Sequence, residues 1–187
     1  MFTKWQSCLS GPVTEVELPD GGHTDWEVEL VVVIGRRAFR IGPDEAWAHV
    51  AGLTVGQDIS ERILQAAGPS PQFSMGKSLP GYGPIGPWLV TLDEIADPND
   101  LELGCEVNGE VVQLSRTSQL IFSVPELIAN LSASVPLLPG DVIFTGTPSG
   151  VGLGRKPPRY LADGDVLTTH IEGLGEMRHS FFTTPEA

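Results

Sequence analysis

Two glutamates at the head of an apolar segment are the first residues that could do chemistry. Residues Trp26–Ile34 read WEVELVVVI, a β-branched run that predicts a strand ending at Gly35. Glu27 and Glu29 are two positions apart, so their side chains share one face, with Cα atoms roughly 6.5–7 Å apart. On a buried face, either a cation lies between the carboxylates or one of them is protonated. If the strand begins in solvent, both are simply hydrated.

A second polar group occurs in the segment DISERILQ. Asp58 is a good N-cap residue for a helix over residues 59–67, and Arg62 and Gln65 follow it at i+4 and i+7. This spacing predicts one helix face that carries a carboxylate, a guanidinium and an amide. The alternative is an N-cap with a surface ion pair, which contributes little to stability.

Two glycine-rich segments add a lysine and two hydroxyl groups. Lys77 is the only charged residue in SMGKSLPGYGPIGPW, where it could meet an anionic ligand or simply lie in solvent. The segment Thr145–Gly154 reads TGTPSGVGLG, and its small residues allow backbone amides to approach a ligand closely. It matches neither a P-loop nor a dinucleotide fingerprint, and a purely structural turn is the alternative.

The elements that must position these residues are mostly strands. Asn108-Gly109 between two apolar runs predicts a hairpin, because both turn positions need a positive φ. Ser123 and Glu126 form a capping box that predicts a helix to about Ser132. The predicted strands cover residues 26–34, 53–57, 87–92, 101–107, 110–115, 141–145, 165–171 and 176–182, and a further short helix covers 44–51. The sequence therefore predicts a β-rich α+β fold with a few short helices.

Length and composition bound the class of protein. The 187 residues predict a single domain over 1–187, large enough to bury a core, and 41% of them are hydrophobic. With 24 acidic and 11 basic residues, the net charge of −13 argues against nucleic acid or a membrane surface as partner. We find no secretory signal and no apolar run long enough for a membrane span. Two widely spaced cysteines predict reduced thiols in a cytoplasmic protein.

Taken together and in order, the motifs closely resemble the fumarylacetoacetate hydrolase family. The resemblance runs from about Phe2 to the C-terminal strand pair, which is essentially the whole chain. The segments that carry it are WEVELVVVIG, GQDISERILQ, GKS with GPIGPW, VNGEVVQ, IFSVPELI and PGDVIFTGTPSGVG.

The resemblance implies a mixed β-sandwich roll of the family's C-terminal-domain type, usually in a homodimer. It implies a divalent ion, Mg²⁺ or Mn²⁺ with Ca²⁺ also possible, held by Glu27, Glu29 and Asp58. Three carboxylates suit such a hard ion and leave positions open for substrate. It places Arg62 and Lys77 among the catalytic, charge-stabilising residues. It also places Arg62, Gln65, Lys77 and Thr147 around the substrate.

The implied substrates are small 2-oxo and β-diketo acids, such as acylpyruvates, fumarylacetoacetate, oxaloacetate and related products of aromatic ring cleavage. The implied reaction is hydrolysis of a C–C bond, in which the ion acts as a Lewis acid toward the enolate that leaves.

One feature of the family is missing from these residues. Hydrolytic members carry a His-x-x-Glu pair before the Phe-x-Lys segment that corresponds here to residues 2–4, and none of the four histidines stands in that context. Three expectations follow. The chain is an N-terminally shortened C–C hydrolase, which would expose apolar sheet surface. It is an enzyme that needs no activated water, namely an oxaloacetate decarboxylase or a 2-oxo-acid isomerase or tautomerase. Or it is a non-catalytic binder of 2-oxo acids.

Overall fold

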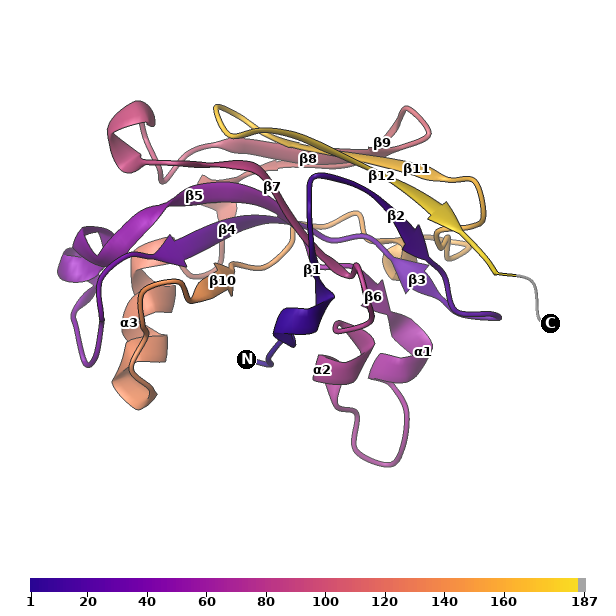
Figure 1. Ribbon diagram of the computed structural model, residues 1–187, viewed down its shortest axis with the longest axis horizontal. Coiled ribbons are helices and arrows are strands. Elements are labelled where there is room, and N and C mark those ends of the chain that lie inside the picture. The colour runs from indigo at the N-terminus through magenta and orange to yellow at the C-terminus, as the bar shows by residue number, and fades with distance from the viewer. Residues whose placement is uncertain (185–187) are drawn as a thin grey trace.

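The computed structural model describes residues 1–184 and consists of two curled β-sheets stacked face to face (Figure 1). The first sheet has the strand order β1 (Leu9–Ser10), β7 (Gly83–Val90), β5 (Val50–Gln57), β4 (Val28–Ile34) and β10 (Val142–Phe144). The second has the order β2 (Val13–Glu17), β12 (Gly175–Phe182), β11 (Val166–Ile171), β8 (Glu102–Val107) and β9 (Glu110–Arg116). A two-stranded ribbon joins β3 (Thr24–Asp25) to β6 (Ser60–Glu61). The β-rich α+β prediction is confirmed.

Apolar side chains between the two sheets form the core. Leu30 and Val55, opposite each other on β4 and β5, are fully buried, and so is Leu167 on β11. Burying such side chains contributes roughly 1.5–3 kcal/mol each toward folding. The long apolar run at the start of β4 is therefore covered on both faces, which means that polar groups on this strand are buried with it.

Helices are short and lie on the outer side of the first sheet (Figure 1). The longest, α3 (Val124–Ser134), begins at the predicted capping box, in which Ser123 and Glu126 bond each other's backbone N–H. The other two, α1 (Arg62–Gln65) and α2 (Phe73–Gly76), lie near the ribbon at the opposite end of the sheet (Figure 1). The 3-10 helices are η1 (Gln6–Cys8), η2 (Pro43–His49), η3 (Leu92–Glu94), η4 (Thr117–Gln119) and η5 (Gly152–Gly154).

The predicted hairpin is present and the helix predicted over residues 59–67 is partly wrong. Asn108 and Gly109 have φ of 53° and 82° and join β8 to β9. Asp58 does not cap a helix, because Ser60 and Glu61 are extended and pair with β3. This pairing delays the helix until Arg62, and Glu61 caps it by accepting a bond from the N–H of Ile63 at 2.9 Å. The helix predicted over residues 44–51 is the 3-10 helix η2.

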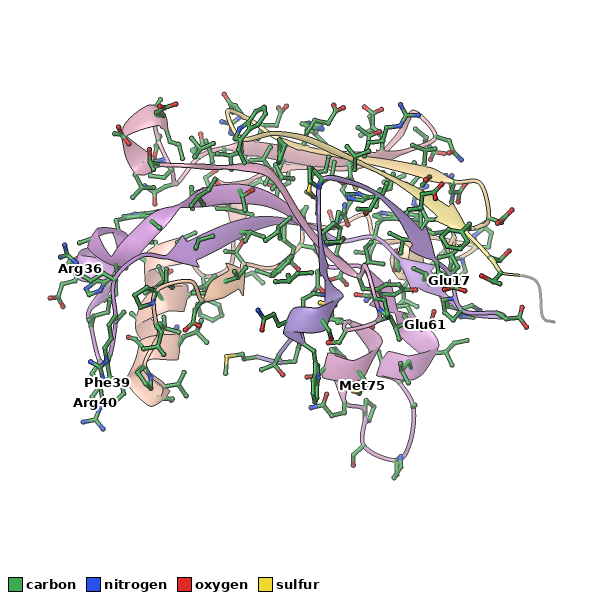
Figure 2. The ribbon with its side chains drawn as sticks, in the orientation of Figure 1. Glu17, Arg36, Phe39, Arg40, Glu61 and Met75 are labelled. Carbon is green, nitrogen blue, oxygen red and sulfur yellow. The ribbon has the colours of Figure 1, made fainter. Side chains whose placement is uncertain are left out.

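Different segments of the chain form the two ends of the molecule. The loop after β4, with Arg36, Phe39 and Arg40, projects from the end opposite Glu61 and Met75 (Figure 2). Among residues 1–184, no helix combines the length and the apolar character needed to cross a bilayer.

Candidate metal centre

Three buried carboxylates meet at the end of the first sheet. Glu27, Glu29 and Asp58 each offer one oxygen atom, and these atoms lie within 4.8 Å of one another. The three residues are 8%, 3% and 2% exposed. Anions packed this closely without water repel one another, so a hard divalent cation among them would remove the repulsion. The donor set therefore fits the ion expected from the sequence.

Backbone bonds fix the approach of the chain segments that carry the triad. The N–H of Asp58 donates to the carbonyl oxygen of Glu27 at 2.9 Å, and the N–H of Glu27 donates to Oε1 of Gln57 at 2.9 Å. Glu27 lies just before β4 rather than inside it, between the ribbon strand β3 and Val28. Asp58 follows the end of β5, the strand paired with β4. Pairing of β4 with β5 thus brings Glu27 and Asp58, which are 31 positions apart in sequence, to one site.

Glu29 is the one carboxylate of the triad that forms no salt bridge among the described residues. Burial raises its pKa well above the ordinary value, and the charges of Asp58 and Glu27 raise it further. The N–H of Gly146 donates to its Oε2 at 2.7 Å and opposes this shift. A bound divalent ion would favour the charged form of Glu29 in the same way.

Lys77 enters the same space from the end of α2. Its Nζ donates to Glu27 Oε2 at 2.8 Å, to Asp58 Oδ2 at 2.5 Å and to Ser60 Oγ at 2.8 Å. Burial alone would lower the pKa of Lys77, but the charges of Asp58 and Glu27 raise it above its usual value. Lys77 is therefore a buried ammonium and not a solvent-exposed lysine.

Lys4 is a second cation at the triad, and the sequence analysis gave it no role. Its Nζ lies 2.8 Å from Asp58 Oδ1 and also donates to the carbonyl oxygens of Tyr82, at 3.0 Å, and of Lys77. The only sequence signal was its place in the Phe-x-Lys segment. Nothing local could have shown that residue 4 reaches residue 58.

Arg62 and Gln65, both on α1, lie on the other side of Glu27. Nη1 of Arg62 lies 2.7 Å from Glu27 Oε1 and 3.0 Å from Gln65 Oε1. Burial would lower the pKa of Arg62, but Glu27 and Asp25 hold it above its usual value. Gln65 Nε2 is a buried donor without a partner among the described residues. A substrate carboxylate or carbonyl oxygen would satisfy it.

Thr147 lies beside the triad without touching it. Its Oγ1 accepts a bond from Gln113 Nε2 at 2.9 Å, and Gln113 Oε1 accepts from the N–H of Val28 at 3.0 Å. Gln113 thus ties the glycine-rich loop to β4. The neighbouring Gly146 makes the direct contact with Glu29.

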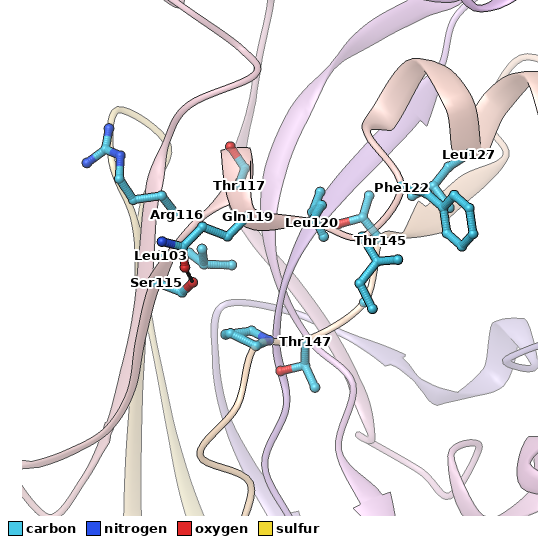
Figure 3. Close-up of a pocket in the computed structure, with 13 residues that line it drawn as sticks. Leu103, Ser115, Arg116, Thr117, Gln119, Leu120, Phe122, Leu127, Thr145 and Thr147 are labelled. Carbon is cyan, nitrogen blue, oxygen red and sulfur yellow. Dashed lines mark hydrogen bonds between the residues drawn. The ribbon is translucent and has the colours of Figure 1, made fainter.

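A cavity of about 250 Å³ adjoins this loop (Figure 3). One wall is formed by residues 145–148, and within this wall the N–H of Gly146 bonds the candidate metal ligand Glu29. The rest is mainly apolar, with Leu103, Leu120 and Phe122 in its lining and Ser115 at one side (Figure 3).

Three of the four histidines contact parts of the described chain away from the triad. His23 stacks on Tyr160 with ring centroids 4.3 Å apart, and His49 lies near the backbone of Arg36. His179 is buried and bonds the carbonyl oxygen of Gly11 at 3.2 Å. Cys8 and Cys105 are both free and buried.

Comparison with known proteins places nearly the whole chain in one family. The model of the fumarylacetoacetate (FAA) hydrolase C-terminal family matches residues 1–181. The oxaloacetate tautomerase FAHD2A, mitochondrial, of Bos taurus is 48% identical over 176 residues, which are 94% of this chain and 56% of that protein. This chain thus spans little more than half the length of that relative.

Two solved structures show the same fold. A Mycobacterium smegmatis protein with the provisional name HpcE is 64% identical, with a TM-score of 0.95 over 97% of this chain and 67% of that one. The fumarylpyruvate hydrolase of Pseudomonas aeruginosa, in complex with Mn²⁺ and pyruvate, is 32% identical. Its TM-score is 0.88 over 98% of this chain and 78% of that one.

Proposed function

The chain belongs to the fumarylacetoacetate hydrolase family, whose members include hydrolases, isomerases and a tautomerase, and from this premise we propose that it is a divalent-metal-dependent tautomerase or isomerase of small 2-oxo acids. The observation that carries the proposal is the buried triad of Glu27, Glu29 and Asp58 with the ammonium of Lys77 bonded to two of its members. Enolisation needs a cation beside the developing enolate oxygen and a group that moves a proton, and these residues can supply both.

The triad would hold Mg²⁺ or Mn²⁺, which would supply Lewis-acid stabilisation of the enolate. Mn²⁺ is the ion bound in the fumarylpyruvate hydrolase structure. Lys77 would deliver a proton to the enol carbon, and the proton of the enol hydroxyl would return to the amine of Lys77, so both the substrate and Lys77 end with the number of protons they began with. Asp58 and Glu27 raise the pKa of Lys77 above its usual value, which favours the ammonium form.

Residues around the triad would orient the substrate. Gln65 Nε2, buried and unpartnered among residues 1–184, would donate to the substrate carboxylate, and Thr147 would approach it from the opposite loop. Arg62 adds positive charge at Glu27. The apolar cavity behind residues 145–148 would take the tail of a substrate longer than oxaloacetate.

Hydrolysis of a C–C bond in acylpyruvates is the second candidate, favoured by the likeness to the fumarylpyruvate hydrolase. It uses the same metal and the same enolate, but it also needs an activated water molecule. The remaining candidate functions are decarboxylation of oxaloacetate and binding of 2-oxo acids without turnover. The homodimer and the cytoplasmic location remain predictions, and the Bos taurus relative carries the word mitochondrial in its name.

One experiment separates these functions. Purified protein with Mg²⁺, with Mn²⁺ or with EDTA is mixed with enol-oxaloacetate, and the enol absorbance and pyruvate release are followed together. A tautomerase removes the enol absorbance without forming pyruvate, whereas a decarboxylase forms pyruvate and CO₂. Acetylpyruvate in a parallel assay yields pyruvate and acetate only if the chain is a hydrolase. Binding of oxalate with Mn²⁺ and no turnover of either substrate would refute the enzymatic proposal.

A further inference from the structure

A fourth carboxylate beside the triad collects an unusual number of donors. Asp25 is fully buried, and its Oδ1 accepts bonds from the N–H groups of Trp26 at 2.8 Å and Gly152 at 2.7 Å. Its Oδ2 accepts from the N–H of Leu153 at 2.9 Å and from Nε of Arg62 at 2.9 Å, and Nη2 of Arg62 lies 2.8 Å away. Nothing in the proposed reaction uses this side chain.

Asp25 and Glu27 share one guanidinium. Two nitrogens of Arg62 face Asp25, and the third, Nη1, lies 2.7 Å from Oε1 of Glu27. A guanidinium with no other counter-charge would form a two-pronged pair with Glu27, because parallel N–H bonds to one carboxylate are the strongest arrangement available. Asp25 leaves Arg62 only one nitrogen for Glu27.

The same carboxylate fixes one end of the glycine-rich loop. A Cβ atom at Gly152 would lie 1.8 Å from the carbonyl oxygen of Arg159 and 2.9 Å from Asp25 Oδ1, so only glycine allows this approach. The other end of the loop is held where Gly146 donates to Glu29. Asp25 and Glu29, which are four positions apart, thus hold the two ends of the glycine-rich loop: Asp25 binds it at Gly152 and Glu29 binds it at Gly146.

We propose that Asp25 is a positioning residue of the metal centre: it holds two nitrogens of Arg62, so that Arg62 pairs only with Oε1 of Glu27 and Oε2, which accepts one bond from Lys77, can still bind a divalent ion. This inference rests on the proposed metal site and extends it to a residue that would not touch the ion. Outer partners of this kind change metal affinity by about 10- to 100-fold when they are replaced.

The test is a double-mutant cycle read by Mn²⁺ binding, measured by calorimetry and by the electron paramagnetic resonance of the free ion. We expect Asp25→Asn to weaken Mn²⁺ binding by about 10- to 100-fold, because the released guanidinium pairs with Glu27. Adding Arg62→Gln to this variant should restore Mn²⁺ affinity to within about fivefold of wild type. The double variant lacks both the carboxylate of Asp25 and the guanidinium of Arg62, so no released cation pairs with Glu27. A purely structural role for Asp25 predicts that the double variant binds no better than Asp25→Asn, and that result would overturn the proposal.

The variant Arg62→Gln alone keeps the proposal testable if Asp25→Asn does not fold. It removes the cation that Asp25 restrains, so Mn²⁺ should bind at least as tightly as in wild type. A loss of more than about tenfold would mean that Arg62 supports Glu27, which contradicts the proposal. Asp100→Asn is the matched control, since Asp100 binds the guanidinium of Arg116 at 2.7 Å on the surface. It should leave Mn²⁺ affinity unchanged.

The readout also separates this inference from the proposed function. Wild-type protein that binds Mn²⁺ without turning over any substrate would refute the tautomerase proposal and leave the cycle fully informative. Wild-type protein that binds no Mn²⁺ would refute both.

Discussion

The Nζ atom of Lys77 lies 2.8 Å from Oε2 of Glu27, although the two residues are 50 positions apart. A buried ammonium and a candidate metal ligand are therefore in direct contact. A divalent ion at the triad must share Glu27 with Lys77, so the two cations compete for one carboxylate while they also repel each other. Removing the charge of Lys77 should therefore strengthen metal binding but weaken turnover.

Replacing Lys77 with methionine should separate the two properties. Lys77→Met keeps the volume and removes the charge, so Mn²⁺ should bind more tightly than in wild type. Turnover should fall by about 10²–10⁴-fold, the usual contribution of a general acid or base. Calorimetry and an enol-oxaloacetate assay measure the two effects. Lys156→Met, at an exposed lysine, is the control. Unchanged turnover in Lys77→Met would remove Lys77 from the mechanism.

Replacing Glu29 should abolish the metal site without unfolding the protein. Glu29→Ala or Glu29→Gln removes one of three ligands, and we expect Mn²⁺ affinity and turnover to be lost together. In metal-free buffer, Glu29→Gln should unfold at a temperature no lower than wild type, because it removes an anion that Asp58 and Glu27 repel. Glu102→Gln, at an exposed position on β8, is the control. Wild-type metal binding in Glu29→Ala would show that the site is wrongly assigned.

A pair of glycine variants tests the close approach in the loop. Gly152→Ala places a methyl group 1.8 Å from the carbonyl oxygen of Arg159, and we expect a loss of about 1–3 kcal/mol in the free energy of unfolding. Gly154→Ala meets nothing nearer than Val151 Cγ2 at 3.8 Å and should be close to neutral. Urea unfolding of both variants measures the difference. Equal stabilities would show that the loop lies elsewhere.

His179 should make the fold sensitive to mild acid. Burial lowers its pKa below the usual 6.5, and the bond to Gly11 only partly opposes this. The unfolded chain therefore binds a proton at a higher pH than the folded protein does. The stability is fully present above about pH 6.5 and is lost as the pH falls toward the lowered value. His179→Gln, which can still donate to Gly11, should flatten this pH dependence in urea titrations. His170→Gln, at a partly exposed position, should retain it.

Filling the cavity should change substrate choice. Ser115 lines the cavity on β9, so Ser115→Trp should exclude substrates with a long acyl tail and leave oxaloacetate turnover nearly unchanged. Val111→Trp, on the same strand at an exposed position outside the cavity lining, is the control. Kinetics with acylpyruvates of increasing chain length measure the effect. Equal losses for short and long substrates would assign the cavity another role.

Local pattern in the sequence predicted most of the strands and the shared face of Glu27 and Glu29, but not the strands β1, β2, β3 and β6. Alternation on one strand gave Glu27 and Glu29, and Asn108-Gly109 gave a turn. Asp58 was the harder case. The family resemblance named it as a metal ligand, and the structure brings its carboxylate close to those of Glu27 and Glu29. Its predicted role as a helix cap was wrong, because Ser60 and Glu61 pair with β3. The first turn of a helix is costly to form, so local propensity alone does not hold Ser60 and Glu61 in a helix when they can pair with β3.

The sequence analysis also missed Lys4 and Asp25, each for its own reason. Asp25 precedes Glu27 by two positions and could have been added to the same face by the same alternation. Lys4 could not have been found in this way, because its partners lie 54 to 78 positions away. Contacts of that separation depend on the completed fold.

The contacts of Lys4 also make the charge of the metal centre depend on the position of the N-terminal segment. Asp58 and Lys77 can meet once residues 27 to 77 have collapsed, but the ammonium of Lys4 arrives only when the N-terminal segment docks beside Tyr82. Whenever this segment is undocked, the triad faces one positive charge fewer than in the folded protein. The docked ammonium of Lys4 therefore weakens the attraction of the triad for a divalent ion, because the two cations repel each other.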